Sequence, residues 1–402
     1  MKKITFRLYQ LSLFILLCWG ANAWFSWSWT LAGLGRLLIL SVFIIISILY
    51  AITNHVKIKI TNKILAVGFL WCFAASFPEF NPGSLVVEAF RFFPLFILLC
   101  DEDNAEKHLS CLSVLLAFVL IPGIVIWGLL MTDQMPLPGI PIEMGDVGDS
   151  YFFMNYIFVL YRIEVLSERF QSIFLEPGYL GTLLVFVLYS NKFNWKKWYN
   201  YVFIIALILS QSVAGYITGV VAYLMNMRIE KRFSISKFVL SAIFLILGGM
   251  VAVTYNEGDN MFNHNIIERF DKSNKKYVGD EDIRNSSQVN NYFESSITNG
   301  DIIFGNSKYS NFEGSAGYKV YMLQWGVISA VIYLLVYLIL IGRLAKSNFY
   351  GYFFLFLIVL TFIQAAYPQS YSWIIPFILG VTVDRRKKIE KKNSQRKLNF
   401  AR

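Results

Sequence analysis

An arginine and a glutamate precede an apolar run in the sequence Arg169-Phe-Gln-Ser-Ile-Phe-Leu-Glu-Pro-Gly-Tyr-Leu-Gly181. Arginine presents a planar fork of N–H donors to anionic oxygens, and a carboxylate can accept a proton from a hydroxyl group. Charges at the edge of a membrane are costly, so they indicate a site rather than bulk solubility. We therefore expect Arg169 to bind an anionic substrate. Glu176 would act as a base or would position the substrate that carries the hydroxyl group. The alternative for Glu176 is a helix N-terminal carboxylate just before Pro177.

Other charged residues stand in apolar or translocated segments. Glu88 and Arg91 lie three residues apart within one apolar run. They form either a buried ion pair that makes insertion tolerable or part of a substrate cavity. Arg269 and Arg284 fall in a long polar segment that should lie outside, where basic residues are disfavoured. For any single outside arginine, a solvated ion pair is the competing interpretation.

The composition indicates the class of protein. Of 402 residues, 56% are hydrophobic and only 15% are charged, and the apolar residues form repeated blocks near the length of a bilayer span. The formal net charge is +10, but residues 384–402 alone carry nine Lys or Arg against two acids. A basic tail after the last span follows the positive-inside rule and attracts anionic lipid. The sequence has no groove-reading motif, so nucleic acid is not an expected partner.

Neither a metal nor another cofactor is expected. The four cysteines lie in or beside apolar runs without metal-ligand or disulfide spacing, and the three histidines are scattered. The acidic triplets at 101–103 and 280–282 are similar to the DxD motif of nucleotide-sugar transferases. The first is predicted on the cytoplasmic side and the second in a solvated loop, so we expect no metal at either.

Hydropathy and loop charge predict an all-α polytopic membrane protein with about 12 transmembrane helices and two long extracytoplasmic loops. Both loops contain more acidic than basic residues. Loops of this length are more often binding surfaces or lids than plain connectors. The predicted segments are a five-helix membrane segment (1–131), a first extracytoplasmic loop (132–176), central membrane helices (177–255), a second loop (256–315), three membrane helices (316–383) and a basic cytoplasmic tail (384–402).

Two segments allow two interpretations each. Met-Lys-Lys, an apolar run and Ala21-Asn22-Ala23 fit either a cleavable signal peptide or, as we favour, an uncleaved first span. The apolar block at 201–226 has basic residues on both flanks, so a single crossing would put one basic cluster outside. Two short crossings, or a re-entrant hairpin that turns near residues 210–215, keep both clusters inside. We favour the hairpin, because small and polar residues at its apex could line a protein-enclosed cavity.

Two stretches resemble bacterial O-antigen and capsule repeat-unit polymerases of the Wzy type. The segment 169–181 is similar to the arginine, the Phe-x-Glu-Pro and the small-residue span start of that family. Ile302-Ile-Phe-Gly305, Gly314-Ser-Ala-Gly-Tyr318 and Gln324-Trp-Gly326 are similar to its apolar–glycine turn, polar stretch and glycine-containing span. The family's frequent second glycine after the turn is replaced here near Asn306-Ser307. The number of spans, the two outside loops and the early intramembrane arginine also match the family plan.

The resemblance implies a multi-pass glycosyltransferase of the bacterial inner (cytoplasmic) membrane with both termini in the cytoplasm. Its substrate would be a polyprenyl-diphosphate-linked oligosaccharide, an activated donor that requires neither ATP nor a metal. With this reaction we assign Arg169 and Arg284 to diphosphate binding, Arg269 as a substitute for either, and Glu176 as the candidate base. Arg91 and Glu88 are further substrate-binding candidates. Membrane lipid, a flippase and a chain-length regulator are the expected partners.

Two other functions stay open. An O-antigen ligase uses the same type of donor but transfers the glycan to a lipid A core. The ligases we would compare carry a histidine motif near the end of the second long loop, whereas His264 lies early in that loop here. A polysaccharide-unit flippase or transporter also fits twelve spans, although the large polar loops and the lack of an evident inverted repeat argue against it.

Overall fold

The computed structural model describes residues 1–28, 34–78, 82–144, 151–162, 169–230, 254, 287–306, 317–344, 349–363 and 369–400. Within these ranges 78% of the residues are helical. The bundle consists of α1 (Lys2–Gly20), α3 (Leu34–Thr53), α4 (Asn62–Ala74), α5 (Pro82–Cys100), α6 (Ala105–Met131), α7 (Pro177–Ser190), α8 (Trp198–Ser210), α9 (Val213–Ile229), α12 (Gly317–Leu344), α13 (Phe349–Phe362) and α14 (Tyr371–Phe400). Shorter elements are α2 (Trp24–Ser28), α11 (Ser287–Asn299) and the 3-10 turns η1 (Glu102–Asn104) and η4 (Asp301–Ile303).

The apolar helices are those of a membrane protein. In the described ranges, residues 83–100, 102–131 and 317–344 are long and apolar enough to cross a bilayer, and several shorter helices are equally apolar. About 20 residues span the hydrocarbon layer, so the shorter helices need protein neighbours at their ends. The count of about twelve spans stays a prediction, because residues 231–253 and most of the second loop lie outside the described residues.

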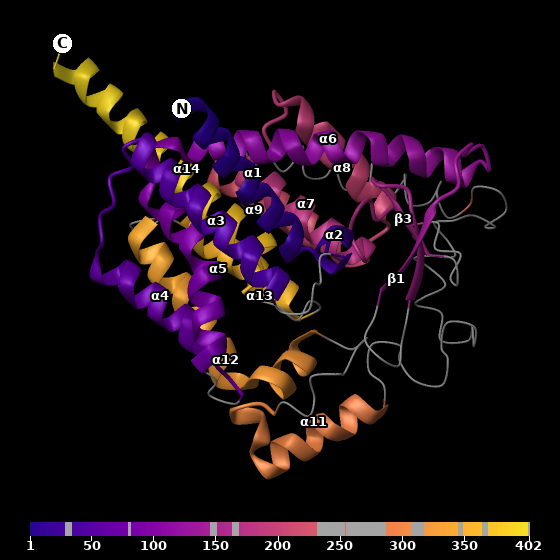
Figure 1. The fold of residues 1–402 in the computed structure, drawn as a ribbon. Coiled ribbons are helices and arrows are strands. Elements are labelled where there is room, and N and C mark those ends of the chain that lie inside the picture. The colour runs from indigo at the N-terminus through magenta and orange to yellow at the C-terminus, as the bar shows by residue number, and fades with distance from the viewer. Residues whose placement is uncertain are drawn as a thin grey trace.

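The polar elements gather at one end of the bundle. Figure 1 shows the N-terminus and the C-terminus together at one end, and the strands and α11 at the far side. We call these the tail end and the outer end. The arrangement puts the described parts of the two long polar segments on the side opposite both termini.

The first polar segment contains a small antiparallel sheet, which the all-α prediction missed. Strands β1 (Ile140–Met144), β2 (Tyr151–Asn155) and β3 (Leu160–Arg162) lie in the order β1-β2-β3. The register pairs Ile142 with Phe153 and Phe153 with Arg162. Phe153 and Leu160 are buried against Trp24 and Leu175, so the sheet is packed on the bundle rather than suspended in water.

The block 201–226 folds back on itself as two helices. α8 ends at Ser210, Gln211 has a left-handed φ of 46°, and α9 starts at Val213. The far ends of both helices meet the residues after α7, because Tyr199 donates to Asn191 at 3.2 Å and Asn226 donates to the carbonyl of Lys192 at 3.0 Å. Both flanks of the block therefore lie at the tail end, and the turn lies at the outer end.

α12 is interrupted where the second polar segment reaches it. Gly326 has φ 82° and ψ 160°, which breaks the helix, and Gly305 has φ 79°. A Cβ on Gly326 would lie 2.4 Å from the carbonyl carbon of Phe304, and the amide of Asn306 donates to the carbonyl of Leu323 at 2.8 Å. Only glycine combines such a φ with so close a backbone contact. Gly305 and Gly326, both from the second polymerase-like stretch, thus lie against each other.

Ion pairs join the helices at the tail end. Lys192 lies 2.5 Å from Asp384 and 2.9 Å from Glu230, and Asp384 also pairs with Lys388 at 2.9 Å. Burial alone would lower the pKa of Lys192, but the carboxylates of Asp384 and Glu230 outweigh it and raise this pKa. The predicted tail 384–402 is not separate from the last membrane helix, because α14 continues without interruption to Phe400.

We expect Lys192→Met to destabilise the protein by about 3 kcal/mol, because it removes a cation that pairs with the buried Asp384 carboxylate. The melting temperature of the purified protein in detergent should fall by several degrees. Lys387→Met is the matched control: Lys387 and its partner Glu106 are both exposed, and such pairs contribute about 0–1 kcal/mol. Equal losses in the two variants would contradict a structural role for the Lys192 ion pairs.

Candidate outer-end site

The segment 169–176 is a buried loop held by backbone hydrogen bonds. Residues 170–174 are buried. The amide of Leu160 in β3 donates to the carbonyl of Ser172 at 2.8 Å, and the Gln171 side chain donates back to the carbonyl of Leu160 at 2.9 Å. On the other side, the backbone amide of Trp24 donates to the carbonyl of Ile173 at 2.8 Å. The loop is therefore fixed between the sheet and the end of α1.

Arg169 contacts the end of α8. Its Nε donates to the carbonyl of Ser210 at 3.2 Å, and the amide of Phe170 donates to the carbonyl of Leu209 at 3.0 Å. The hydroxyl of Tyr216 donates to the carbonyl of Ile208 at 2.5 Å. The last carbonyls of a helix lack intrahelical partners, and a cation there also complements the helix dipole. Arg169 thus has a structural role at the α8–α9 turn, whatever else it binds.

Glu176 marks the start of α7. It is the N-cap residue, Pro177 is the first helical residue, and the side chain makes no capping hydrogen bond. This is the helix N-terminal position that the sequence left open as an alternative. The side chain is exposed on the protein surface, and its role as a base stays a prediction. An exposed carboxylate at this position is accessible to a polar ligand arriving from the outer end.

Gly181 completes the motif by allowing a close helix contact. A Cβ on Gly181 would lie 2.9 Å from the Cβ of Ser212 and 3.5 Å from the Cα of Gly215. α7 therefore approaches the α8–α9 turn more closely than a side chain would permit. Arg169 and Gly181, at the two ends of the motif, both contact the same turn.

The pair of Glu88 and Arg91 lies in the outer half of α5. Arg91 Nη1 is 2.5 Å from Glu88 Oε1, and Trp71 Nε1 on α4 donates to Glu88 Oε2 at 3.3 Å. Glu88 is buried, whereas 30% of the Arg91 side chain is exposed. The structure therefore shows the ion pair, and a role of Arg91 in substrate binding stays a prediction.

Sequence reasoning missed the tyrosines around this ion pair. Tyr333 of α12 and Tyr371 at the start of α14 are both buried and lie within electrostatic range of Arg91. The Tyr371 hydroxyl has no hydrogen-bond partner among the described residues. In the sequence, both tyrosines stand among other aromatic and aliphatic residues of apolar helices, and nothing in that pattern distinguishes them. Only the packing of α4, α5, α12 and α14 brings them together.

The end of α1 connects the ion-pair region to the Arg169 loop. The hydroxyls of Ser370 and Ser372, which flank Tyr371, donate to the carbonyl of Gly20 at 2.5 and 3.2 Å. Two residues later, the carbonyl of Asn22 accepts from the amide of Leu175 at 3.0 Å. The two groups of candidate residues are thus linked through one short stretch of backbone.

Other predicted residues lie elsewhere. Arg269 and Arg284 fall outside the described residues, so their place relative to Arg169 stays a prediction. The triplet at 101–103 lies at the tail end, where Asp101 accepts from Tyr50 and lies 2.8 Å from Nε2 of His108. His108 belongs to the first turn of α6 and is buried.

No protein-family profile, curated protein or solved structure matches this chain.

Gly181→Ala should destabilise the protein by about 1–3 kcal/mol, because its methyl group overpacks the contact with Ser212. Gly178→Ala is the matched control one turn earlier in α7, where an added Cβ meets nothing within 4 Å. The control should be neutral or slightly stabilising, since alanine is the better helix former. Melting temperatures of the two purified variants measure the difference. A Gly181→Ala protein as stable as Gly178→Ala would refute the close contact.

Proposed function

We propose that this protein polymerises polyprenyl-diphosphate-linked oligosaccharide repeat units for a surface polysaccharide of the O-antigen, capsule or exopolysaccharide type. A hydroxyl of the incoming unit attacks the anomeric carbon of the growing glycan. The bond from that carbon to the diphosphate oxygen breaks, polyprenyl diphosphate leaves, and the hydroxyl proton passes to a base. In this proposal the protein lies in the inner membrane of a bacterium, its outer end faces away from the cytoplasm, and both termini lie in the cytoplasm.

The observation that carries the proposal is Arg91, a charged residue inside the apolar helix α5 whose side chain is 30% exposed. A charge within a membrane span is expensive and usually marks a substrate path. Glu88 compensates the charge through Nη1, and 30% of the side chain stays accessible for anionic oxygens. A lipid-linked diphosphate, with its charged group at the membrane surface and its chain in the bilayer, matches this depth.

The remaining roles follow from exposure and position. Glu176 lies exposed at the outer end, where it could take the proton of an acceptor sugar. Arg169 donates through Nε to the α8–α9 turn, and we propose that it is also a diphosphate ligand. Arg269 and Arg284 are proposed as further diphosphate ligands. A flippase that delivers the units and a chain-length regulator are the proposed protein partners.

Glu176→Gln tests the proposed base without disturbing the fold, because its side chain is exposed and makes no capping bond. We expect polymer formation to fall about 100-fold or more, the usual effect of losing a general base. The readout is the surface-glycan ladder on a gel, from cells in which the variant replaces the chromosomal gene. Glu294→Gln, which neutralises an exposed carboxylate on α11 at the same end, should leave the ladder unchanged.

Arg91→Lys tests the binding role while keeping the positive charge beside Glu88. Lysine lacks the bidentate fork, so the ladder should shorten or disappear although the membrane level of the protein stays normal. Arg228→Lys, at an exposed tail-end position, is the matched control. Normal ladders from both Glu176→Gln and Arg91→Lys would refute the site.

Deletion of the gene separates the three candidate functions. Accumulation of lipid capped with a single unit supports a polymerase. A unit that is neither polymerised nor exported indicates a flippase, and polymer that stays on the carrier lipid indicates a ligase. Either of the last two results would overturn the proposed function.

A further inference from the structure

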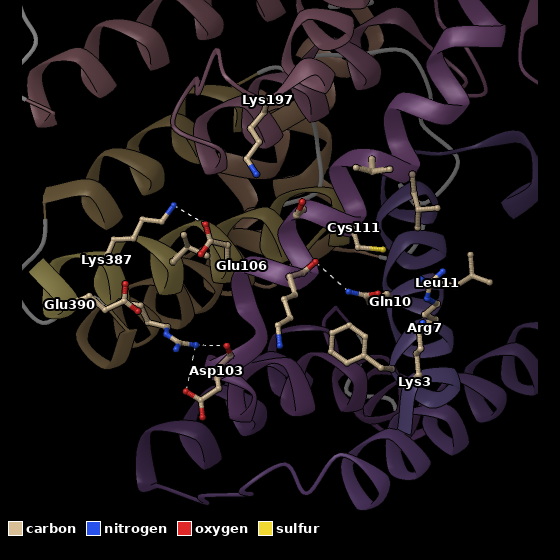
Figure 2. A pocket seen from close by; sticks show the side chains of 17 residues that line it. Lys3, Arg7, Gln10, Leu11, Asp103, Glu106, Cys111, Lys197, Lys387 and Glu390 are labelled. Carbon is tan, nitrogen blue, oxygen red and sulfur yellow. Dashed lines mark hydrogen bonds and ion pairs between the residues drawn. The ribbon is translucent and has the colours of Figure 1, made fainter. Parts of the chain in front are cut away.

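A cavity opens at the tail end, far from the Arg169 loop. It has a volume of about 870 Å³ and lies between α1, α6 and α14, with Lys197 reaching in from the turn before α8. Figure 2 shows Lys197 and Lys387 on one side of the cavity and Lys3 and Arg7 on the other. The proposed polymerase chemistry makes no use of this space.

The charge balance of the cavity wall is positive. Six basic and three acidic residues line it. Asp103 is 3.4 Å from Arg386 and Glu106 is 2.9 Å from Lys387, so two of the acids are already paired. Within the described ranges, Lys3, Arg7 and Lys197 have no ion pair with an acid. Cations brought together without acidic partners repel one another, and an anion between them removes that cost.

One wall of the cavity is apolar and continues toward the bilayer. Val114 and Leu115 of α6 line the cavity. Farther along the same face of α6, at spacings of about one helical turn, Phe118, Ile121 and Val125 are exposed. Phe118 packs edge-to-face on Trp198 with ring centroids 6.2 Å apart, and half-exposed tryptophans are typical of the membrane–water interface.

We propose that this cavity binds one anionic glycerophospholipid of the leaflet at the tail end. The phosphate group lies between Lys3, Arg7 and Lys197, and an acyl chain runs along the exposed apolar face of α6. Charge complementarity selects the anionic headgroup, and the continuous apolar wall selects a lipid over a soluble phosphate. Bound there, the lipid would join α1, α6 and the α7–α8 turn.

The site is independent of the proposed polymerase function. It lies at the end of the bundle opposite the candidate active site, and none of its cations belongs to that site. Binding of the phospholipid can therefore be measured on the full-length protein without any glycan substrate.

The test compares two charge-neutralised double variants by native mass spectrometry in detergent with added phosphatidylglycerol. Wild-type protein should retain one phosphatidylglycerol and should not retain phosphatidylcholine. Arg7→Gln with Lys197→Gln should weaken retention about tenfold or more, as expected for losing two cations at a lipid phosphate. Lys57→Gln with Lys59→Gln, exposed in another basic turn at the same end, should bind like wild type. Equal retention by the two double variants would overturn the proposal.

A second measurement uses the unaltered protein and does not depend on how variants fold. Cys111 lines the cavity, so phosphatidylglycerol should slow its modification by a small thiol reagent, measured by peptide mass spectrometry. Phosphatidylcholine and inorganic phosphate should not. Protection by phosphatidylcholine, or by inorganic phosphate alone, would contradict a site for an anionic lipid.

Discussion

The last carbonyl groups of α8 lie inside the protein, where they need hydrogen-bond donors. The outer end of the structure depends on the residues that supply those donors. Leu209 accepts from the amide of Phe170 and Ser210 from the Arg169 side chain, while Ile208 accepts from both the Tyr216 hydroxyl and the amide of Gln211. An unpaired carbonyl at the edge of a bilayer costs several kcal/mol, which is why a short helix can end there only with protein donors. The turn at Gln211 and the Arg169 loop therefore hold each other in place.

The same contact sets the position of α7. Residues 180–190 are all buried, so this helix has no face for lipid and must fit between α8, α9 and α14. Gly181 allows the close approach at the outer end, and Ser190 donates to the carbonyl of Pro376 at 2.8 Å toward the tail end. Glu176 consequently projects from a rigid helix start, as a residue that must meet a substrate in a defined orientation should.

Sequence patterns predicted the helical membrane class and the polar ends of the bundle, because hydropathy and charge report these directly. The i,i+3 spacing of Glu88 and Arg91 offered an ion pair as one of two alternatives, and the structure shows that pair. The sequence patterns missed the three-stranded sheet, since its short strands lie in a polar segment without clear alternation. They also missed the burial of His108 and the tyrosines near Arg91, which depend on contacts between distant helices. The exposure of Glu176 depends on local packing that no spacing rule reports. Arg169 was predicted as a ligand, and its bond to Ser210 shows a structural role as well.

The most direct test of the proposed reaction is reconstitution of the purified protein in lipid vesicles with a polyprenyl-diphosphate-linked repeat unit from its host. Incubation without nucleotide or added metal should convert single units into lipid-linked dimers and longer chains, and should release one polyprenyl diphosphate for each bond formed. Mass spectrometry of the extracted lipids measures both products. Single units that stay unjoined while wild-type protein is folded, with no polyprenyl diphosphate released, would contradict the account.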